Sequence, residues 1–444
     1  MYDHNTCSFG RDDDPSGTDS SGMDPKFYGL ISGGFLISIV ALILVYYVLF
    51  YRKNRKRITL KKPITKKETT CGSSSIENIG EDKTVGFHLG YTYAVSSMQG
   101  WRVYMEDRHI ICDAYSNETV KTYTTTPINL PVNHALFSVL DGHGGKFASD
   151  YASRQLVPIL CQQKSFLDYI ELIESSDKQA KIGSNQLNME LKSLLEESLE
   201  NAFVDLDFSL KKVQQDMSVN LDTKGSLFCS KNADIEKAEG LKMNSFVKDT
   251  TPFSGTTAVV VLITPKFIIC ANLGDCRAVL HSTSMSPAPY SQVSNKTEAL
   301  SVDHKPDAPK ERDRIESRGG VVKHQRVNGL LGVSRSLGDY EYKDYSPHNK
   351  EETGLMIARR QRVSPIPDIS VNALNADQEK FLVLACDGVW DVLNNQECCD
   401  LIQNMLQEGK SDLGLICEKV LDECLDRGSR DNMTMIVVKF SGRK

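Results

Sequence analysis

Four acidic sites share one local pattern, in which a carboxylate residue stands beside a turn-forming residue next to an apolar run. A single Asp-Gly pair is usually an ordinary turn, because both residues tolerate turn geometry. Several carboxylates gathered at the ends of buried strands are costly unless they are paired or bind metal. The pattern therefore indicates a divalent-cation site, and oxygen ligands favour Mg²⁺ or Mn²⁺ over Zn²⁺. The four sites are Glu106-Asp107, Asp141-Gly142, Asp387-Gly388 and Asp431-Asn432.

Other familiar catalytic motifs are missing from the sequence. It contains no GxxxxGK[ST], HExxH or GxSxG motif and no His-Cys dipeptide, which excludes several common hydrolase and phosphatase mechanisms. The twelve cysteines form no CxxC pair and no zinc-type spacing. They therefore indicate a reducing compartment.

The acidic sites fall within seven spaced motifs. These are Met98-Gln99-Gly100-Trp101-Arg102 with Met105-Glu106-Asp107, Asp141-Gly142-His143-Gly144-Gly145, Gly255-Thr256-Thr257-Ala258, Gly274-Asp275-Cys276-Arg277, Val333-Ser334-Arg335-Ser336-Leu337-Gly338-Asp339, Ala385-Cys386-Asp387-Gly388-Val389-Trp390-Asp391 and Gly428-Ser429-Arg430-Asp431-Asn432. In this order they resemble the successive motifs of the PPM family, the metal-dependent type 2C protein serine/threonine phosphatases. The resemblance covers about residues 87–441.

The resemblance implies an α+β fold, a four-layer αββα sandwich of two antiparallel sheets flanked by helices, with a metal site at one end. It implies Mg²⁺ or Mn²⁺ as the cofactor, with two ions in each active site. Asp141 would bridge both ions, and Asp275 matches a position linked to a weaker third ion. The remaining implied ligands are Glu106, Asp107, the backbone carbonyl of Gly142, and Asp387 with Asp431 at one of the ions.

The difficulty of the expected reaction explains why such a site is needed. Hydrolysis of a phosphate monoester requires accelerations of up to about 10²¹-fold, whereas one general acid supplies about 10² to 10⁴. Two cations can activate a water that attacks phosphorus in line, without a phosphoenzyme. By the resemblance, Arg102 grips the substrate phosphate and His143 protonates the departing oxygen. The expected function is hydrolysis of phosphoserine and phosphothreonine in proteins.

Two alternative functions belong to other classes. A catalytically silent PPM-like scaffold would bind a signalling partner at a membrane, but pseudoenzymes commonly lose an acid, and this sequence retains all four Asp residues of the acidic sites. A two-metal hydrolase that acts on nucleic acid or on another phosphomonoester is disfavoured by the motif set. The net charge of -6 divides into -4 over residues 1–27, +9 over 52–67 and -11 over the rest, and an acidic body does not suit a nucleic-acid partner.

The secondary structure that must position these motifs alternates between strands and helices. Leucines at spacings of three and four predict an amphipathic helix over residues 187–206. The short link Thr264-Pro265-Lys266 predicts antiparallel pairing of the strands on either side of it. Strands are predicted at residues 91–97, 135–140, 257–263, 267–271, 381–385 and 433–440, because these runs are short and β-branched or aromatic.

The sequence departs from the family pattern in a few places. Tyr104 stands where an acid is common and Cys276 where Ser is common, and neither is an implied ligand, so activity should survive. Residues 115–133, 207–252 and 284–300 are predicted surface additions without a readable motif. The segment 332–338 suggests a mobile flap, in which Arg335 matches a family position near the site.

An uncharged run over residues 28–51 predicts a single transmembrane helix of about 36 Å. Its acidic leading flank and its length disfavour a cleaved signal peptide. The basic residues that follow predict that the N-terminus is lumenal or extracellular and that everything after residue 52 is cytosolic. The same basic run either binds anionic lipid, at about 1 kcal/mol per charge, or is a topology signal alone. The endoplasmic reticulum and the plasma membrane remain alternative locations.

The predicted domain organisation has four parts. They are an acidic tail at residues 1–27, the transmembrane helix at 28–51, a basic flexible tether at 52–86 and a phosphatase domain at 87–444. A flexible tether of about 34 residues has a root-mean-square reach of about 30 Å. The expected partners are phosphoprotein substrates and the membrane, with no nucleic acid, and the expected oligomeric state is a monomer.

Overall fold

The computed structural model describes residues 59–73, 90–113, 130–131, 133–178, 185–222, 254–285, 293–348, 350–374 and 379–441. They fall within the unit Thr59–Lys444, which is separate from a second unit, Met1–Ile58. The predicted acidic tail, the predicted transmembrane helix and residues 52–58 therefore lie outside the described residues. Within the described ranges, no helix is both long and apolar enough to cross a membrane.

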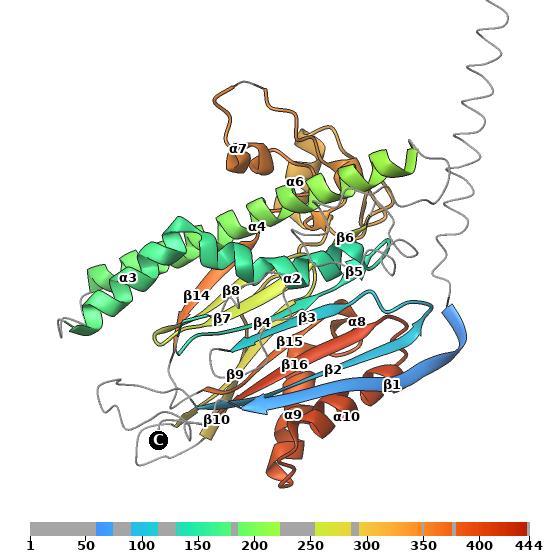
Figure 1. Cartoon of the computed structure of the whole chain (residues 1–444). Helices are drawn as coiled ribbons and strands as arrows, with labels where there is room; N and C mark the ends of the chain where they lie inside the picture. The colour runs from blue at the N-terminus through green and yellow to red at the C-terminus, as the bar shows by residue number, and fades with distance from the viewer. Residues whose placement is uncertain are drawn as a thin grey trace, which may run out of the picture. The chain divides into compact units, whose positions relative to one another are not determined.

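Two antiparallel sheets pack face to face at the centre of the molecule (Figure 1). Buried apolar residues fill the space between them, among them Phe137, Val261, Leu382 and Ile436. The five-stranded sheet has the order β14 (Asp368–Ala373), β8 (Phe267–Leu273), β7 (Ala258–Ile263), β4 (Ala135–Leu140) and β3 (Arg108–Asp113). The six-stranded sheet has the order β1 (Thr59–Ser73), β2 (Tyr91–Arg102), β16 (Met433–Phe440), β15 (Glu379–Ala385), β9 (Arg277–Met285) and β10 (Val293–Ala299).

Helices cover the outer face of each sheet (Figure 1). The five-stranded sheet packs against α2 (Phe147–Gln162), α3 (Lys164–Lys178) and α4 (Asn185–Asp222). The six-stranded sheet packs against α8 (Asp387–Trp390), α9 (Asn395–Gln407) and α10 (Leu413–Asp426). Helix α9 begins with a capping box between Asn394 and Glu397, which satisfies free N–H groups at its start. These layers confirm the predicted α+β fold of two antiparallel sheets flanked by helices.

Several elements lie where the sequence pattern places them. Strands β4 and β16 match the predicted runs residue for residue. Helix α4 contains the predicted amphipathic helix, and its Leu191, Leu195 and Leu199 are fully buried. Strands β7 and β8 pair antiparallel across their short link, as expected.

The prediction that residues 52–86 form a flexible tether is wrong over strand β1. Residues 59–73 instead pair antiparallel with β2 and form one edge of the six-stranded sheet. Their Lys, Thr and Ser content is typical of a linker, but the backbone gains its hydrogen-bond partners from β2. The connecting residues 74–89 lie outside the described residues.

Two of the predicted surface additions also belong in part to the folded body. Helix α4 continues through residues 207–222, and Asp207, Leu210 and Gln214 are buried, so the prediction of a surface addition is wrong over residues 207–216. Residues 293–299 of the second addition form β10 at the sheet edge. Residues 223–253, 286–292 and most of the predicted addition at 115–133 lie outside the described residues.

A small group of elements lies between β10 and β14. It consists of α6 (Pro309–Ser317), β11 (Val322–Lys323), β12 (Arg326–Val327), β13 (Leu337–Gly338), the 3₁₀ helix η2 (Tyr340–Tyr342) and α7 (Gly354–Arg359). Its buried cluster includes Ile315, Val327 and Val363. Arg335, which matches a family position near the site, forms ion pairs with Glu311 at 2.7 Å and with Asp368 at 2.6 Å. It therefore joins α6 to β14.

Replacing Glu311 with Gln should lower the free energy of unfolding by about 3 kcal/mol at pH 7, because it leaves buried arginines without their counter-charge. Burial opposes ionisation of Glu311, but hydrogen bonds from Arg335 and Arg314 outweigh it and lower the pKa of Glu311 to about 2. The stabilisation is therefore complete above the unfolded-state pKa of 4.5 and is lost as the pH falls towards 2.

Urea denaturation at pH 7 and pH 3 measures this effect. The difference between wild type and Glu311→Gln should shrink at pH 3, and the exposed neighbour Glu316 on the same helix, changed to Gln, is the control. A difference that stays the same at both pH values contradicts the assignment.

Candidate active site

The predicted acidic residues stand where strands of both sheets end. Asp141 follows β4, and Asp107 precedes β3, which pairs with β4. Asp387 follows β15 as part of α8, and Asp431 precedes β16, which pairs with β15. Antiparallel pairing places the end of one strand beside the start of its neighbour. The carboxylates of the two sheets consequently gather at one edge of the sandwich.

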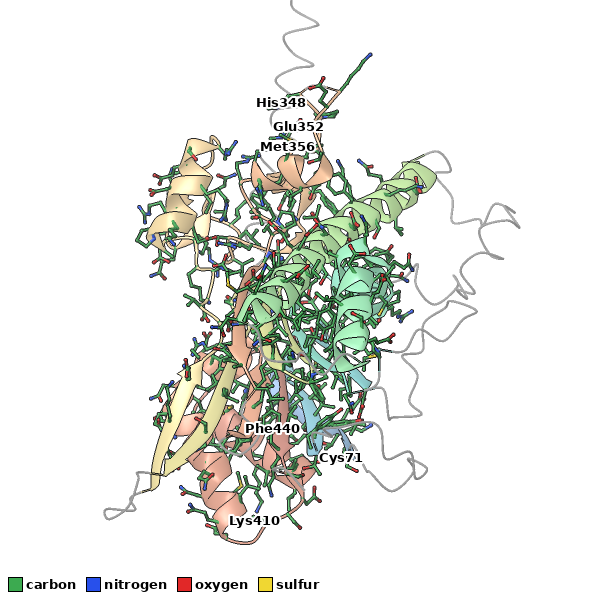
Figure 2. The ribbon with its side chains drawn as sticks, turned by 90° about the vertical axis from the view of Figure 1, so that its left-hand side faces the viewer. Cys71, His348, Glu352, Met356, Lys410 and Phe440 are labelled. Carbon is green, nitrogen blue, oxygen red and sulfur yellow. The ribbon has the colours of Figure 1, made fainter. Side chains whose placement is uncertain are left out.

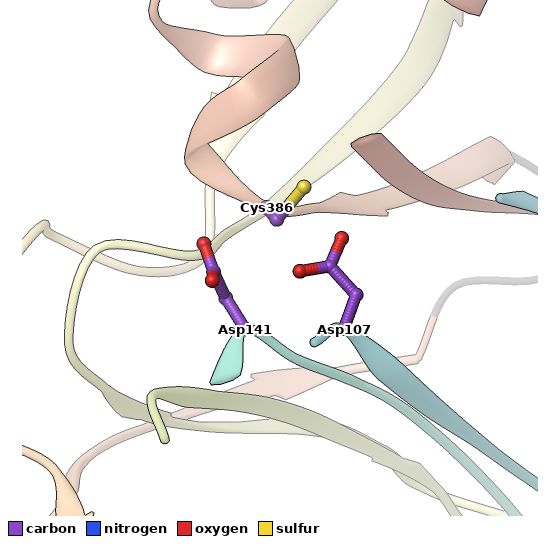
Figure 3. A group of neighbouring side chains, drawn as sticks. All are labelled: Asp107, Asp141 and Cys386. Atoms are coloured by element: carbon purple, nitrogen blue, oxygen red, sulfur yellow. The ribbon is translucent and has the colours of Figure 1, made fainter. Parts of the chain in front are cut away.

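Asp107 and Asp141 form the tightest group at this edge. One oxygen from each carboxylate and the Sγ of Cys386 all lie within 4.8 Å of one another. Figure 3 shows the three side chains converging from three separate elements. Two carboxylates at this separation repel each other unless a proton or a cation lies between them.

Cys386 lacks the properties of a metal ligand. Burial raises the pKa of its thiol well above the ordinary value, so the sulfur stays protonated. Its Sγ accepts a hydrogen bond from Thr434 N at 3.2 Å, and the S–H donates to Asn432 O at 3.5 Å. The thiol therefore links β15 to the start of β16, and the oxygens of the group remain the donors for a hard cation.

Two buried carboxylate oxygens of the cluster, Asp107 Oδ1 and Asp387 Oδ1, accept no hydrogen bond from any described residue. The other oxygen of Asp107 accepts one from Thr434 Oγ1 at 2.8 Å. An unsatisfied buried acceptor is costly, and it calls for a partner. Anionic oxygens with free lone pairs fit Mg²⁺ or Mn²⁺, so the residues present suit the cofactor that the resemblance implies.

The raised pKa values of the clustered carboxylates also agree with a cation site. Burial raises the pKa of Asp107 to about 7, and repulsion from Asp431 adds to the effect. Burial also raises the pKa of Asp141, with repulsion from Asp107 and Asp387 as the next causes. The pKa of Asp387 is raised by burial and by Asp275. A bound cation would reverse these shifts, because it stabilises the ionised form.

Adding Mn²⁺ should raise the melting temperature by about 5 °C more at pH 7.5 than at pH 5.5. In the metal-free protein the folded-state pKa of Asp107 is raised from 3.8 to about 7, so stability falls as the pH rises through that window. Metal binding requires the ionised carboxylates and releases protons, so the cation binds more tightly at the higher pH. Thermal melts with Mn²⁺ and with a chelator measure the difference, and an equal shift at both pH values contradicts the account.

Asn432 holds the segment that carries Glu106. Its Oδ1 accepts a hydrogen bond from Glu106 N at 2.9 Å, and its Nδ2 donates to Gln99 O at 2.9 Å and to Tyr104 O at 3.0 Å. The Glu106 side chain in turn accepts a hydrogen bond from Gly145 N at 2.7 Å. Tyr104 itself is exposed, which agrees with its lack of a ligand role.

Gly142 lies at a point of close approach between elements. A Cβ at this position would collide with Glu106 O and with Ser149 Oγ. Only glycine therefore lets the turn after β4 pack against the Glu106 segment. The close packing keeps the backbone of Gly142 beside Asp141 and Glu106.

Arg102, at the end of β2, contacts the cluster directly. Its Nη2 donates a hydrogen bond to Asp431 Oδ2 at 2.5 Å. Burial opposes its charge, but Asp431, Asp141 and Glu106 outweigh burial and raise the pKa of Arg102. A planar guanidinium beside the carboxylates is suited to hold the oxygens of a phosphate group.

His143 pairs with a residue that the sequence did not single out as functional, Asp339. His143 Nε2 and Asp339 Oδ2 are 2.7 Å apart, and Ser336 Oγ donates to the same oxygen at 2.7 Å. Burial opposes protonation of His143, but Asp339 outweighs it and raises the pKa of His143. Burial likewise opposes ionisation of Asp339, and His143 outweighs it, so the pKa of Asp339 is lowered. The pair therefore favours the cationic form of His143.

A three-stranded sheet brings this pair together. It has the order β13, β6 (Gly255–Thr256) and β5 (Gly142–His143), and Gly255 pairs with both His143 and Gly338. A Cβ on Gly255 would collide with Asp339 Oδ2 and would meet His143 Nε2 at 2.5 Å. Asp339 has a left-handed backbone, with φ of 53°, which a non-glycine residue adopts only at a cost.

The predicted third-metal residue, Asp275, has a cationic partner. Lys305 Nζ donates to Asp275 Oδ2 at 2.6 Å. Burial opposes the charge of Lys305, but Asp275, Asp387 and Asp391 outweigh it and raise the pKa of Lys305. Asp391 is the C-cap residue of α8, four positions after Asp387, and its carboxylate also raises the pKa of Asp387. Sequence reasoning left out Lys305 and Asp391, although Asp391 closes one of the seven motifs.

Known proteins resemble this chain in sequence. The family model for protein phosphatase 2C matches residues 91–226 and 214–433. Protein phosphatase ppm-1.A of Caenorhabditis elegans is 36% identical over 352 residues, which cover 79% of this chain and 59% of that protein. Protein phosphatase 1B of Bos taurus is 34% identical over 385 residues, which cover 86% of this chain and 60% of that protein. The chain thus spans about 60% of the length of these two relatives.

A solved structure shares the fold. The crystal structure of a serine-threonine phosphatase 2C from Toxoplasma gondii has a TM-score of 0.55 and 21% sequence identity, and the match covers 84% of this chain and 99% of that one. At this identity the likeness concerns the fold alone. The matched residues of the family model extend over most of the chain. This chain therefore belongs to the protein phosphatase 2C family.

Proposed function

We propose that the chain is a protein serine/threonine phosphatase whose active site works with Mg²⁺ or Mn²⁺. The observation that carries the proposal is the convergence of Asp107 and Asp141, together with two buried oxygens, Asp107 Oδ1 and Asp387 Oδ1, that accept no hydrogen bond from the described residues. The names of the relatives, protein phosphatases ppm-1.A and 1B, support a protein phosphatase activity. The acidic body of the chain suits cation binding and disfavours a nucleic-acid substrate.

The residues that would hold the cations are those of the acidic cluster. They are Asp107, Asp141, Gly142 through its carbonyl, Asp387 and Asp431, with Glu106 beside them and Asp275 towards a weaker third site. When bound, the cations would supply Lewis-acid chemistry that makes water a nucleophile and neutralises charge on the phosphoryl oxygens. The raised pKa values of Asp107, Asp141 and Asp387 describe the cost of gathering these carboxylates in one buried place.

Arg102 and His143 would contact the substrate on either side of the reacting phosphorus. Arg102 would bind the phosphate oxygens, and this contact would replace part of its hydrogen bonding to Asp431. His143, kept cationic by Asp339, would donate its proton to the serine or threonine oxygen as the bond to phosphorus breaks. That proton transfer avoids release of an unstable alkoxide.

The alternative of a catalytically silent scaffold finds less support. A scaffold has no need for several carboxylates with raised pKa values at one point, because their burial lowers stability. An active site needs them. The complete acidic set and the His143–Asp339 pair therefore favour the enzyme.

The proposal extends to membrane attachment through residues 28–51, with residues 1–27 in the lumen or outside the cell and the phosphatase domain in the cytosol. The uncharged run and the basic residues after it support this topology. Protease treatment of sealed vesicles that expose their cytosolic side should remove an epitope tag at the C-terminus. Protection of that tag would contradict the topology.

Phosphate release from phosphothreonine peptides by the full chain in detergent tests the enzymatic proposal. Release should require Mn²⁺ or Mg²⁺ and should stop in a chelator, because the cations would activate the attacking water and neutralise charge on the phosphoryl oxygens. Undiminished release in the chelator, or none with either metal, would refute it.

A further inference from the structure

We propose that the active site acts on phosphoserine and phosphothreonine held close to a lipid bilayer, in phosphorylated segments of membrane-anchored proteins. The inference rests on the proposed phosphatase function and the proposed membrane span, and it names the class of substrate. What carries it is strand β1, which lies before the region matched by the family model.

Strand β1 pairs with β2 continuously over its second half and at two positions, separated by register shifts, over its first half. Its register with β2 is continuous from Lys67, opposite Met98, to Ser73, opposite Thr92, and further pairs lie nearer its start. Gly72 packs so closely that a Cβ there would collide with the ring of Tyr93. The strand is therefore part of the folded body.

Helix α10 also contacts β1. Lys67 Nζ forms an ion pair with Asp422 at 2.7 Å, and Thr69 Oγ1 donates to Glu418 Oε1 at 2.7 Å. A Cβ on Gly414 of α10 would meet Cys71 Sγ at 2.8 Å, so α10 and β1 are in close contact. These contacts come from a helix that also packs against β2 and β16.

The register places the beginning of β1 at the active-site edge. Thr59 pairs with Arg102, the residue beside Asp431 in the acidic cluster. The strand then runs away from the site, and Cys71 near its other end pairs with Ala94. Figure 2 shows Cys71 towards the same end of the molecule as Phe440, the last residue of β16.

The chain between the proposed span and β1 is short. Eight residue steps lead from Tyr51 to Thr59, and even fully extended they cover at most about 29 Å. The pairing adds about 5 Å between the Cα atoms of Thr59 and Arg102. Arg102 would therefore stay within about 34 Å of the bilayer surface, whereas the 34-residue tether expected from composition would extend to about 120 Å.

The positive charge of residues 52–58 favours an even smaller distance between Arg102 and the bilayer. Residues 52–58 include five Lys or Arg residues and no acid. Basic residues next to a span are attracted to anionic lipid headgroups on the cytosolic face. The active site would thus meet phosphorylated residues near the bilayer at a high effective concentration, and distant residues would lie beyond its reach.

Two insertions of the same length test whether the short connection before β1 limits the distance between the active site and the bilayer. A 30-residue Gly/Ser segment between Lys56 and Arg57 lengthens the connection before β1, and the same segment between Gly80 and Glu81 lengthens the connection after it. Each full-length protein is placed in vesicles with a phosphothreonine peptide attached to lipid, either by five residues or by a Pro-rich spacer of about 30 residues, about 90 Å long. A soluble phosphothreonine peptide serves as the reference substrate.

Wild type should dephosphorylate the near peptide at least about 10-fold faster than the far peptide. The insertion before β1 should reduce this preference at least about 5-fold, and the insertion after β1 should leave it within about 2-fold of wild type, because β1 holds the fold in place. Equal effects of the two insertions, equal wild-type rates on both lipid-attached peptides, or a chain that does not float with the vesicles would overturn the inference. Loss of activity on the soluble peptide would instead mark failure of the proposed function.

Discussion

Changing Asp141 to Asn should reduce phosphate release from a phosphothreonine peptide by about 10³-fold or more, while the metal-free protein stays as stable as wild type or becomes more so. Asp141 stands in the centre of the acidic cluster, where burial and the charges of Asp107 and Asp387 raise its pKa. The amide keeps the shape of the side chain but removes a negative charge that the cations need. It also removes repulsion within the folded protein.

Two measurements together test the role of Asp141. Melting in a chelator reports the stability of the metal-free protein, and the assay with Mn²⁺ reports catalysis. Asp313, an exposed residue on α6, changed to Asn, is the matched control and should alter neither. An Asp141→Asn protein that retains about a tenth of wild-type activity, or that unfolds, would contradict the role given to this residue.

Changing Asp339 to Asn should lower kcat on a phosphothreonine peptide by about 100-fold but lower it less than about 3-fold on p-nitrophenyl phosphate. Asp339 Oδ2 lies 2.7 Å from His143 Nε2, raises the pKa of His143 and orients the imidazole. A threonine oxygen must be protonated as it leaves, whereas p-nitrophenolate leaves as a stable anion. Loss of the general acid therefore matters for the first substrate alone.

His143→Gln should show the same dependence on the leaving group, and the double variant should lose little more than either single variant, because both changes remove one function. Ser336→Ala, which removes only a second hydrogen bond to Asp339, should have a smaller effect in the same direction. Equal loss on both substrates would show that Asp339 supports the fold and does not orient a general acid.

Regular sequence patterns predicted much of the fold. The apolar runs of β4 and β16 and the leucine spacing of α4 depend on local properties of the chain, because side chains repeat with the period of the element. Strand β1 was missed for the opposite reason. Its polar sequence becomes a strand only through contacts with β2 and α10, and these are far away in the sequence.

The candidate site was predictable where its residues end apolar strands. Asp107, Asp141 and Asp387 follow or precede buried runs. Antiparallel pairing of β3 with β4 brings Asp107 beside Asp141, and the packing of the two sheets brings Asp387 to the same edge. Asp339 follows no such run, and its pairing with His143 depends on the register of β5, β6 and β13. Lys305 lies in an irregular segment, and nothing in its local sequence indicates its contact with Asp275.

Anomalous diffraction from a crystal soaked in Mn²⁺ would show whether carboxylates from both sheets hold hard cations. We expect Mn²⁺ peaks in direct contact with Asp107 or Asp141 from one sheet and with Asp387 or Asp431 from the other. The same arrangement of carboxylates with no Mn²⁺ bound among them would contradict this metal site.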